Sequence, residues 1–405
     1  MLRKYLAGWP PQFLLLLFGC LFSATGSTLV WPFLSIFLRE KLGVTLTAVT
    51  LLLTVYSAAG VLASFAAGAA CDRYGRRLVL LVGLFCSAAY NVLMTRADSY
   101  LAFAVLIGAF GAFSTLYAIG ANAMVADLVE EERRTEAYAA LRMMQNVGVA
   151  IGPVIGGYLI GISYNVTFLV AACAYAVFGV LTLAAIRETL PAAQKTASRQ
   201  NGGGFGPVLR DRLFLISSTS YTFIMMVTAC MFLLLPVYAK ENFGMPESQY
   251  GYIVTLNALM CIFLQVGVTR LTKKFNLTTV LVSGALFYAV GAGSVALGSG
   301  FWHFAASMVI LTTGELILSP TSTALVARFA PAEMRGRYMS VFSLTWPVGS
   351  GAGPVIASLL NDRISPASMW YGAFCFGLLS ALGYLVLQRQ TRAAQSVEPS
   401  IEIPM

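Results

Sequence analysis

The stretch GVAIGPVIGG, from Gly148 to Gly157, places four glycines and a proline inside a long apolar run. Each of these residue types weakens a helix. The stretch GSGAGPVIAS, from Gly349 to Ser358, repeats the pattern 201 residues later in a second apolar run. Two copies of one helix-breaking pattern indicate an internal repeat and a structural need that both copies share.

The composition indicates a membrane protein. Of the 405 residues, 58% are hydrophobic and 11% are charged, and the mean hydropathy is +0.77. This leaves too little polar surface to cover a soluble globule. The net charge is +9, but the basic residues lie in short gaps between apolar runs, which favours membrane topology over nucleic-acid binding. The seven cysteines have no metal-ligand spacing, so we expect neither a metal site nor a cofactor.

Twelve apolar runs are long enough to cross a bilayer as helices, since one crossing needs about 20 residues. They lie at 13–38, 45–69, 78–96, 99–126, 137–161, 164–186, 214–239, 248–269, 278–298, 302–327, 337–360 and 367–388. We therefore predict an all-α integral membrane protein with two six-helix bundles, residues 1–186 and 214–388. A central loop at 187–213 joins the bundles, and a tail follows at 389–405.

The two halves match at the constant offset of 201 residues. Arg39-Glu40 corresponds to Lys240-Glu241, and Gly43 corresponds to Gly244. A parallel repeat of this kind, with a pseudo-two-fold axis along the membrane normal, is a transporter architecture. Most of the 26 Lys and Arg residues fall on one side if both termini and the central loop are cytoplasmic, as the positive-inside rule requires. We thus expect a multi-pass protein of a bacterial cell membrane.

The gap between the second and third runs reads GAACDRYGRRLVL, from Gly68 to Leu80. This stretch resembles the loop motif GxxxDRxGRR of the major facilitator superfamily, and the stretch at Gly148 resembles that superfamily's antiporter motif GxxxGPxxGG. The resemblance covers nearly the whole chain and implies transport by alternating access between two bundles. The corresponding hairpin of the second half, LTKKFN, lacks the aspartate.

The segment from Thr312 to Ser340 resembles helix 10 and the following loop of twelve-helix drug:proton antiporters from bacteria. In those proteins the glutamate at the position of Glu315 is associated with handling protons or cationic drugs. Many members also carry an arginine in helix 4. The run at 99–126 has none, so that part of the coupling cannot be transferred.

The family's loop motif implies a conformational latch. We expect Asp72 to cap the helix at 337–360, because a carboxylate stabilises a helix N-terminus. One of the loop arginines would meet Asp127. Such contacts would bias a two-state equilibrium, although a permanent structural cluster would look the same in sequence. The predicted latch residues are Gly68, Asp72, Arg73, Gly75, Arg76, Arg77 and Asp127.

The glycine-rich stretches predict close helix packing, because small residues let helices approach in lipid and proline bends them. We interpret them as a seam against the other half that seals an outer gate. Ordinary packing without a gating role is the alternative. The seam residues are Gly148, Gly152, Pro153, Gly156, Gly157, Gly349, Gly353 and Pro354.

Glu315 is the one carboxylate near the middle of a predicted span. A buried acid there should be protonated, paired or open to a wet cavity, and each state suits proton exchange. Thr312, Ser319 and Ser322 share its helix face. A structural, hydrogen-bonded acid is the alternative.

A second polar stripe lies in the run at 137–161. Arg142 is either a proton-coupling counter-charge or a residue whose head reaches the membrane surface, since it lies about 8 Å from the start of its helix. The predicted cavity residues are Gln145, Asn146, Asn257, Thr312 and Ser319.

Taken together, these patterns predict a proton-coupled efflux antiporter of amphipathic small molecules, neutral or cationic, whose partners are protons, the substrate and the bilayer. The alternatives are a proton-coupled uptake symporter for a sugar, peptide or metabolite, or a lipid flippase. A membrane-embedded enzyme is disfavoured by the single histidine and the lack of HExxH and GxSxG motifs. The short tails disfavour a sensor. The sequence leaves the substrate's identity and the oligomeric state open.

Overall fold

The computed structural model describes residues 8–190, 206–331 and 334–397. Within these ranges every regular element is a helix, as predicted. Most of the central loop predicted at 187–213 and the end of the tail predicted at 389–405 lie outside the described residues.

The helices of the first half correspond to the first six predicted runs. They are α2 (Pro11–Val30), a 3-10 turn (Trp31–Phe33), α3 (Leu34–Leu42), α4 (Leu46–Tyr74), α5 (Arg76–Met94), α6 (Tyr100–Leu128), α7 (Arg134–Ile162) and α8 (Tyr164–Ala185).

The helices of the second half follow a short helix, α9 (Gly206–Arg210). They are α10 (Arg212–Leu233), α11 (Leu235–Phe243), α12 (Glu247–Thr272), α13 (Leu277–Ser294), α14 (Phe301–Phe329), α15 (Arg335–Ser343), α16 (Thr345–Arg363) and α17 (Ser368–Val397).

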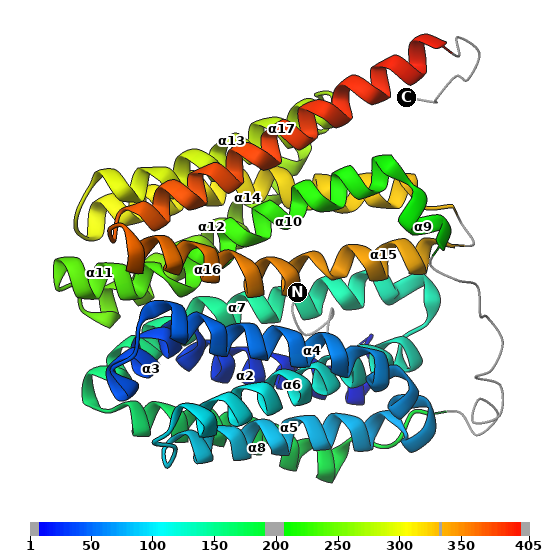
Figure 1. The fold of residues 1–405 in the computed structure, drawn as a ribbon. Coiled ribbons are helices and arrows are strands. Elements are labelled where there is room, and N and C mark those ends of the chain that lie inside the picture. The colour runs from blue at the N-terminus through cyan, green and yellow to red at the C-terminus, as the bar shows by residue number, and fades with distance from the viewer. Residues whose placement is uncertain (1–7, 191–205, 332–333, 398–405) are drawn as a thin grey trace. The chain divides into compact units, whose positions relative to one another are not determined.

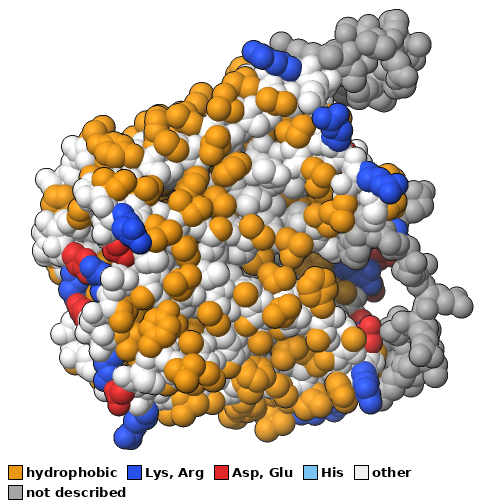
Figure 2. All heavy atoms as spheres, viewed as in Figure 1, with side chains coloured by type: hydrophobic (Ala, Val, Ile, Leu, Met, Phe, Trp, Pro, Cys, Tyr) orange, Lys and Arg blue, Asp and Glu red, His pale blue; other side chains and the backbone are white. Residues whose placement is uncertain are grey.

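Eleven helices of the described residues are long and apolar enough to cross a membrane. The remaining predicted run, 337–360, is occupied by α15 and α16, which meet at Leu344. Figure 2 shows hydrophobic side chains covering the sides of the helices, while charged side chains gather toward helix ends. Large apolar residues such as Leu62, Phe65 and Phe263 are more than two-thirds exposed, at 71%, 71% and 75%. This surface suits lipid, so the chain is a multi-pass membrane protein.

The chain divides into two compact units (Figure 1). The first unit comprises residues 1–202 and 232–262; in it α2 packs on α7 and α8, and α6 packs on α4 and α5. The second unit comprises residues 203–231 and 263–405; in it α13 packs on α14 and α17. Residues 232–262 belong to the first unit because α11 contacts α3 and α12 contacts α7.

The repeat is visible in the local backbone. Gly43 ends α3 and Gly244 ends α11, each in the left-handed conformation with φ of 62° and 63°. Glycine adopts this conformation without the steric cost that a Cβ atom would bring.

At two prolines, the backbone carbonyl that lacks its usual helical partner receives a side-chain hydrogen bond instead, because proline has no N–H to donate. Pro236 frees the carbonyl of Phe232, and the hydroxyl of Tyr250 donates to that oxygen at 3.1 Å. Pro320 frees the carbonyl of Leu316 inside α14, and here the donor is the side-chain amide of Gln265, at 3.0 Å. In both cases a side chain of α12 supplies the missing hydrogen bond.

Candidate functional site

Gly75 forms the turn between α4 and α5 and has φ of 98°. A Cβ atom at this position would lie 2.3 Å from a carboxylate oxygen of Glu188. The backbone N–H groups of Arg76 and Arg77 donate to the two oxygens of Glu188 at 3.0 and 3.1 Å. Glycine is therefore required at this turn, where the carboxylate of Glu188 caps the start of α5.

The pKa of Glu188 reflects two opposing effects. Burial alone would raise it, but hydrogen bonds from the backbone N–H groups of Leu190, Arg76, Arg77 and Thr189 outweigh burial and lower the pKa below its ordinary value. Glu188 was not among the predicted site residues. Its only sequence signal is an acid directly after the sixth apolar run.

Arg76 lies at the centre of this region, with its side chain only 9% exposed. Its Nε atom lies 3.1 Å from Asp127 Oδ2, and its Nη2 atom lies 3.4 Å from Asp72 Oδ1. The predicted contact between a loop arginine and Asp127 is thus confirmed for Arg76. We call Asp72, Arg76, Asp127 and Glu188 the Arg76 cluster; it joins α4, α5 and α6 to the segment after α8.

The other predicted latch residues take different positions. The guanidinium of Arg73 lies over the ring of Tyr74, 5.3 Å from its centroid. The Nη2 atom of Arg77 donates to the carbonyl of Leu183 at 2.5 Å. Gly68 has open space where a side chain would project. Capping of the helix at 337–360 by Asp72 stays a prediction.

The glycines of α7 pack mainly on α2. A Cβ atom at Gly148 would lie 2.9 Å from the backbone nitrogen of Thr25, and one at Gly156 would lie 2.2 Å from the carbonyl oxygen of Leu29. A Cβ at Gly152 would lie 2.9 Å from the carbonyl oxygen of Thr25. The expectation that these three glycines face the other half is wrong. They let two helices of the same half approach.

The second-half glycines pack in the corresponding way. Cβ atoms at Gly349 and Gly353 would lie 2.5 and 2.7 Å from atoms of Met225 and Met226 on α10. Met225 and Met226 lie 201 residues after Ala24 and Thr25, which contact Gly148. Pro354 is buried inside α16 in the same stretch. The internal repeat therefore preserves the helix contacts of these glycines as well as their positions in the sequence.

One end of α7 does contact a helix of the second repeat. A Cβ at Gly157 would lie 2.7 Å from Ser248 Cα, and one at Gly251 would lie 2.4 Å from the carbonyl oxygen of Pro153. The hydroxyl of Thr255 also donates to the carbonyl of Ala150 at 2.6 Å. We call this contact between α7 and α12 the Gly157 seam. A gating role for it stays a prediction.

Ion pairs near the same end of the first unit were missing from the sequence prediction. Arg39 pairs with Glu241, and Lys240 pairs with Glu40 and Glu247, both at 2.5 Å. Burial would lower the pKa of Lys240, but the carboxylates of Glu247 and Glu40 outweigh it and raise the pKa. We call these the outer ion pairs, because the topology expected from the sequence places them on the outer side. The match of Arg39-Glu40 with Lys240-Glu241 was the available signal, because a repeated basic-acidic pair lets each residue pair with the copy of its neighbour.

A cavity of about 330 Å³ lies within the first unit. Ser23 and Tyr117 share a hydrogen bond of 2.6 Å at its wall, and Tyr56 and Ser114 share one of 3.2 Å. No charged side chain lines it among the residues that the structure describes. Its polar lining residues are Ser23, Ser27, Tyr56, Ser114, Thr115, Tyr117, Gln145 and Tyr175. We call it the tyrosine cavity.

The predicted cavity residues of α7 are only partly gathered there. Gln145 lines the tyrosine cavity, whereas Arg142 and Asn146 are not among its lining residues. Arg142 is exposed and Asn146 is half-buried. Asn257 is buried in α12, with 5% of its surface exposed. The two interpretations of Arg142 both stay open.

Glu315 lies half-buried on α14, five residues before Pro320. Thr312 and Ser322 are fully buried, and Ser319 is half-buried. The Ser322 hydroxyl lies 3.3 Å from that of Tyr384. The carbonyl that Gln265 bonds belongs to Leu316, the residue directly after Glu315. The acid therefore lies directly before a carbonyl that Pro320 frees and that Gln265 bonds.

These features define a class of protein, a membrane transporter built from two repeated helical bundles. The chain belongs to the Major Facilitator Superfamily, whose family model matches residues 16–246 and 217–404.

Two curated relatives and one solved structure are similar to this chain. A Na(+), Li(+), K(+)/H(+) antiporter of Planococcus maritimus is 26% identical over 401 residues, covering 90% of this chain and 91% of the relative. The multidrug resistance protein MdtH of Escherichia coli strain SMS-3-5 is 26% identical over 334 residues, covering 80% and 81%. A crystal structure of the peptide transporter POT in complex with sulfate has a TM-score of 0.77 at 17% identity and covers 95% of each chain.

Proposed function

We propose that this protein is a proton-coupled efflux antiporter of amphipathic small molecules that works by alternating access. The main structural support for this proposal is the lining of the tyrosine cavity. Its walls combine phenol rings, hydroxyl groups and one amide, without a charged side chain among the described residues. Such a surface binds flat, apolar molecules that carry a few hydrogen-bonding groups. It offers no fixed counter-charge for the ends of a peptide or for a carboxylate.

Glu315 is the proposed proton carrier. It is a half-buried carboxyl in a membrane span, where an acid that exchanges its proton between the two sides can couple proton movement to transport. Its negative form would also attract a lipophilic cation. Two relatives, named as a cation/proton antiporter and a multidrug resistance protein, support exchange over one-way uptake.

Transport in proteoliposomes tests the proposal. The substrate is ethidium, a permanently charged lipophilic cation, and the membrane potential is clamped so that only the pH difference drives movement. An antiporter should accumulate ethidium in vesicles with an acidic lumen while the lumen becomes more alkaline. Accumulation in vesicles with an alkaline lumen would instead identify a symporter. Movement of Na⁺ or K⁺ but not ethidium would replace the proposed substrate class.

Glu315→Gln keeps the shape of the side chain but cannot titrate. It should reduce coupled proton movement at least tenfold, while Glu315→Asp retains part of it. Glu130→Gln is the matched control, because it makes the same chemical change at an exposed position outside the spans. If Glu315→Gln still exchanges protons for ethidium at the wild-type rate, the coupling site lies elsewhere.

A further inference from the structure

The internal repeat brings an unusual set of residues to the turn between α12 and α13. At the offset of 201 residues, Asp72 corresponds to Lys273 and Asp127 corresponds to Arg328. Arg76, which both acids contact in the first unit, corresponds to Leu277. The second unit therefore carries two cations where the first carries two carboxylates, and an apolar side chain where the first has its central cation.

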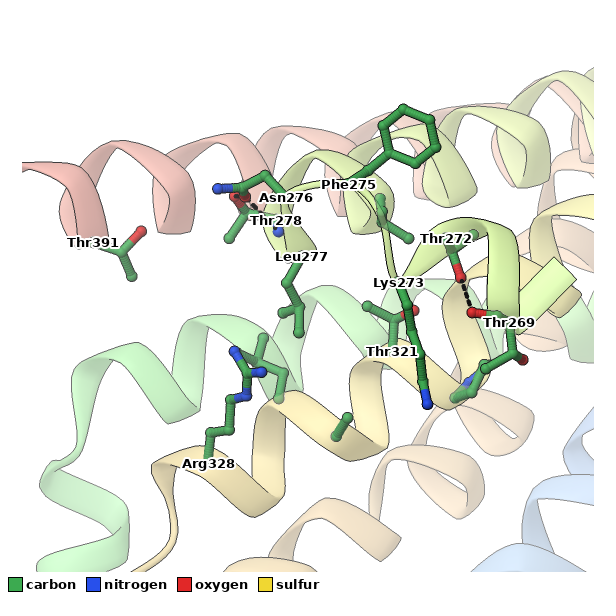
Figure 3. Close-up of a pocket in the computed structure, with 14 residues that line it drawn as sticks. Thr269, Thr272, Lys273, Phe275, Asn276, Leu277, Thr278, Thr321, Arg328 and Thr391 are labelled. Carbon is green, nitrogen blue, oxygen red and sulfur yellow. Dashed lines mark hydrogen bonds between the residues drawn. The ribbon is translucent and has the colours of Figure 1, made fainter. Parts of the chain in front are cut away.

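A cavity of about 530 Å³ occupies this place in the second unit. It lies between the ends of α12, α13 and α14, with Thr391 of α17 at its edge (Figure 3). The side chains of Arg328 and Lys273 line it from α14 and from the residue directly after α12. The remaining polar lining consists of hydroxyl and amide groups, from Thr269, Thr272, Asn276, Thr278 and Thr321.

The charge in this cavity is unbalanced. No carboxylate lines it, and neither Lys273 nor Arg328 has an ion-pair partner, within the residues that the structure describes. At the corresponding positions of the first unit, the cation Arg76 pairs with the carboxylates of Asp72 and Asp127. An anion from outside the chain would give the two cations of the second unit a partner in the same way.

We propose that this cavity binds a phosphate-bearing anion. A guanidinium presents paired N–H donors that match phosphate oxygens, and an ammonium adds a mobile point charge. The threonine hydroxyls can donate to the remaining oxygens. The volume accommodates a phosphate group together with the small groups attached to it.

The surroundings favour the headgroup of an anionic lipid over free phosphate. Phe275 lines the cavity and is 60% exposed, and Leu271, one turn before it, is 57% exposed. These apolar side chains provide a surface for acyl chains beside the cationic lining. Basic pockets between membrane helices bind anionic headgroups in this way. Bound phosphate would connect the α12–α13 turn to α14, as Asp127 and Arg76 connect α6 to α5 in the first unit.

Lipid retention by the full chain tests the proposal. The protein is purified from nanodiscs of phosphatidylcholine with and without phosphatidylglycerol, and bound lipid is counted by native mass spectrometry. The double variant Lys273→Gln/Arg328→Gln should retain at least tenfold less phosphatidylglycerol than wild type. The control Arg270→Gln/Lys274→Gln removes two nearby charges that do not line the cavity and should retain the wild-type amount. Equal retention by both double variants would overturn the proposal.

A second arm separates the two sources of phosphate. Inorganic phosphate that displaces phosphatidylglycerol and protects the protein against thermal unfolding, with chloride as control, would identify a free anion as the occupant. Protection by phosphatidylglycerol alone would identify a lipid headgroup. Protection by neither ligand would contradict the proposal.

A third variant distinguishes loss of lipid binding from misfolding. Lys273→Asp/Leu277→Arg/Arg328→Asp rebuilds in the second unit the charge arrangement of Asp72, Arg76 and Asp127. This triple variant should stay folded in phosphatidylcholine alone and should gain no thermal protection from phosphatidylglycerol. A triple variant that still responds to the lipid like wild type would show that the anion binds elsewhere.

Discussion

The outer ion pairs and the Arg76 cluster both lie at positions that the internal repeat relates, but they differ in whether their contacts join the two copies or stay within one. Arg39 and Glu40 pair with Glu241 and Lys240, so each residue meets the copy of its neighbour. Arg76 instead pairs with Asp72 and Asp127 inside its own repeat, and the second copy reverses the two acids. Reciprocal contacts between the two copies require the same charge pattern in both copies. Contacts inside one copy carry no such requirement, so the second copy is free to differ.

The largest expected effect is at the Gly157 seam, which like the outer ion pairs crosses between repeats. In Gly251→Leu the new side chain would collide with the backbone carbonyl of Pro153, since a Cβ already lies 2.4 Å from that oxygen. We expect α7 and α12 to separate there. A cysteine at Ser248, in a variant without the seven native cysteines, should react with impermeant reagents at least tenfold faster.

Gly161→Leu is the control for this change. Gly161 lies on the same helix as Gly157, and no atom lies within 4 Å of its Cβ position. Labelling should stay at the wild-type rate. Equal labelling of the two leucine variants would show that the glycines of the seam do not hold these helices together.

The next effect concerns the cluster inside one repeat. Arg76→Gln removes the cation that pairs with Asp72 and Asp127. The side chain of Arg76 is buried but that of Asp72 is 46% exposed, so the loss should lie between about 1 kcal/mol for an exposed ion pair and about 3 kcal/mol for a buried one. The loss of stability should be visible in denaturant unfolding. Arg73→Gln, which removes a guanidinium stacked on Tyr74, should cost far less, and a similar loss in both variants would contradict a central role for Arg76.

A smaller effect is expected for the outer ion pairs. The side chains of Arg39 and Glu241 are 26% and 42% exposed, and exposed pairs contribute at most about 1 kcal/mol. Arg39→Glu should destabilise the protein by bringing two acids together, and adding Glu241→Arg should restore the pair. A double-mutant cycle on unfolding free energies measures this coupling. Purely additive effects would mean that the two side chains do not interact in solution.

The smallest effect is a pH dependence. Because the pKa of Glu188 is lowered in the folded protein, its contribution to stability is complete above its ordinary pKa of 4.5 and is lost as the pH falls through the lowered value. Glu188→Gln should remove this part of the acid sensitivity below about pH 5. Unfolding midpoints measured over that range check it. Glu130→Gln, at an exposed position, should leave the pH dependence of the unfolding midpoint as in the wild type. The same pH dependence in Glu188→Gln would show that Glu188 does not contribute to acid sensitivity.

Much of the fold could be predicted from sequence because long apolar runs and a gapless repeat are strong signals. The helix that packs against the α7 glycines could not be predicted from the sequence. A membrane helix is apolar on its lipid side as well as on its packed side, so the pattern does not reveal which way Gly152 points. The sequence shows that a close approach occurs, and only the structure identifies α2 as the neighbour.

The candidate site was predictable to a similar extent. A contact of one loop arginine with Asp127 followed from the loop motif, although the motif did not identify Arg76 as that arginine. Glu188 lies 112 residues from Arg76 and belongs to no motif. The tyrosine cavity was also missed, apart from Gln145, because its phenols and hydroxyls come from five helices and read as ordinary apolar spans. Side chains gathered from distant helices leave no local pattern in a single sequence.

The two hydrogen bonds that α12 donates to proline-freed carbonyls also differ in the order in which donor and acceptor are synthesised. The carbonyl of Phe232 is freed by Pro236, but its donor, Tyr250, is made later in the chain. That oxygen therefore lacks its hydrogen bond from Tyr250 in the nascent protein until α12 has been synthesised. The carbonyl of Leu316 meets the opposite situation, since Gln265 is already present when Pro320 emerges. The donor for the Phe232 carbonyl is synthesised after its acceptor, whereas the donor for the Leu316 carbonyl is synthesised before it. Both hydrogen bonds therefore depend on α12 having reached its position.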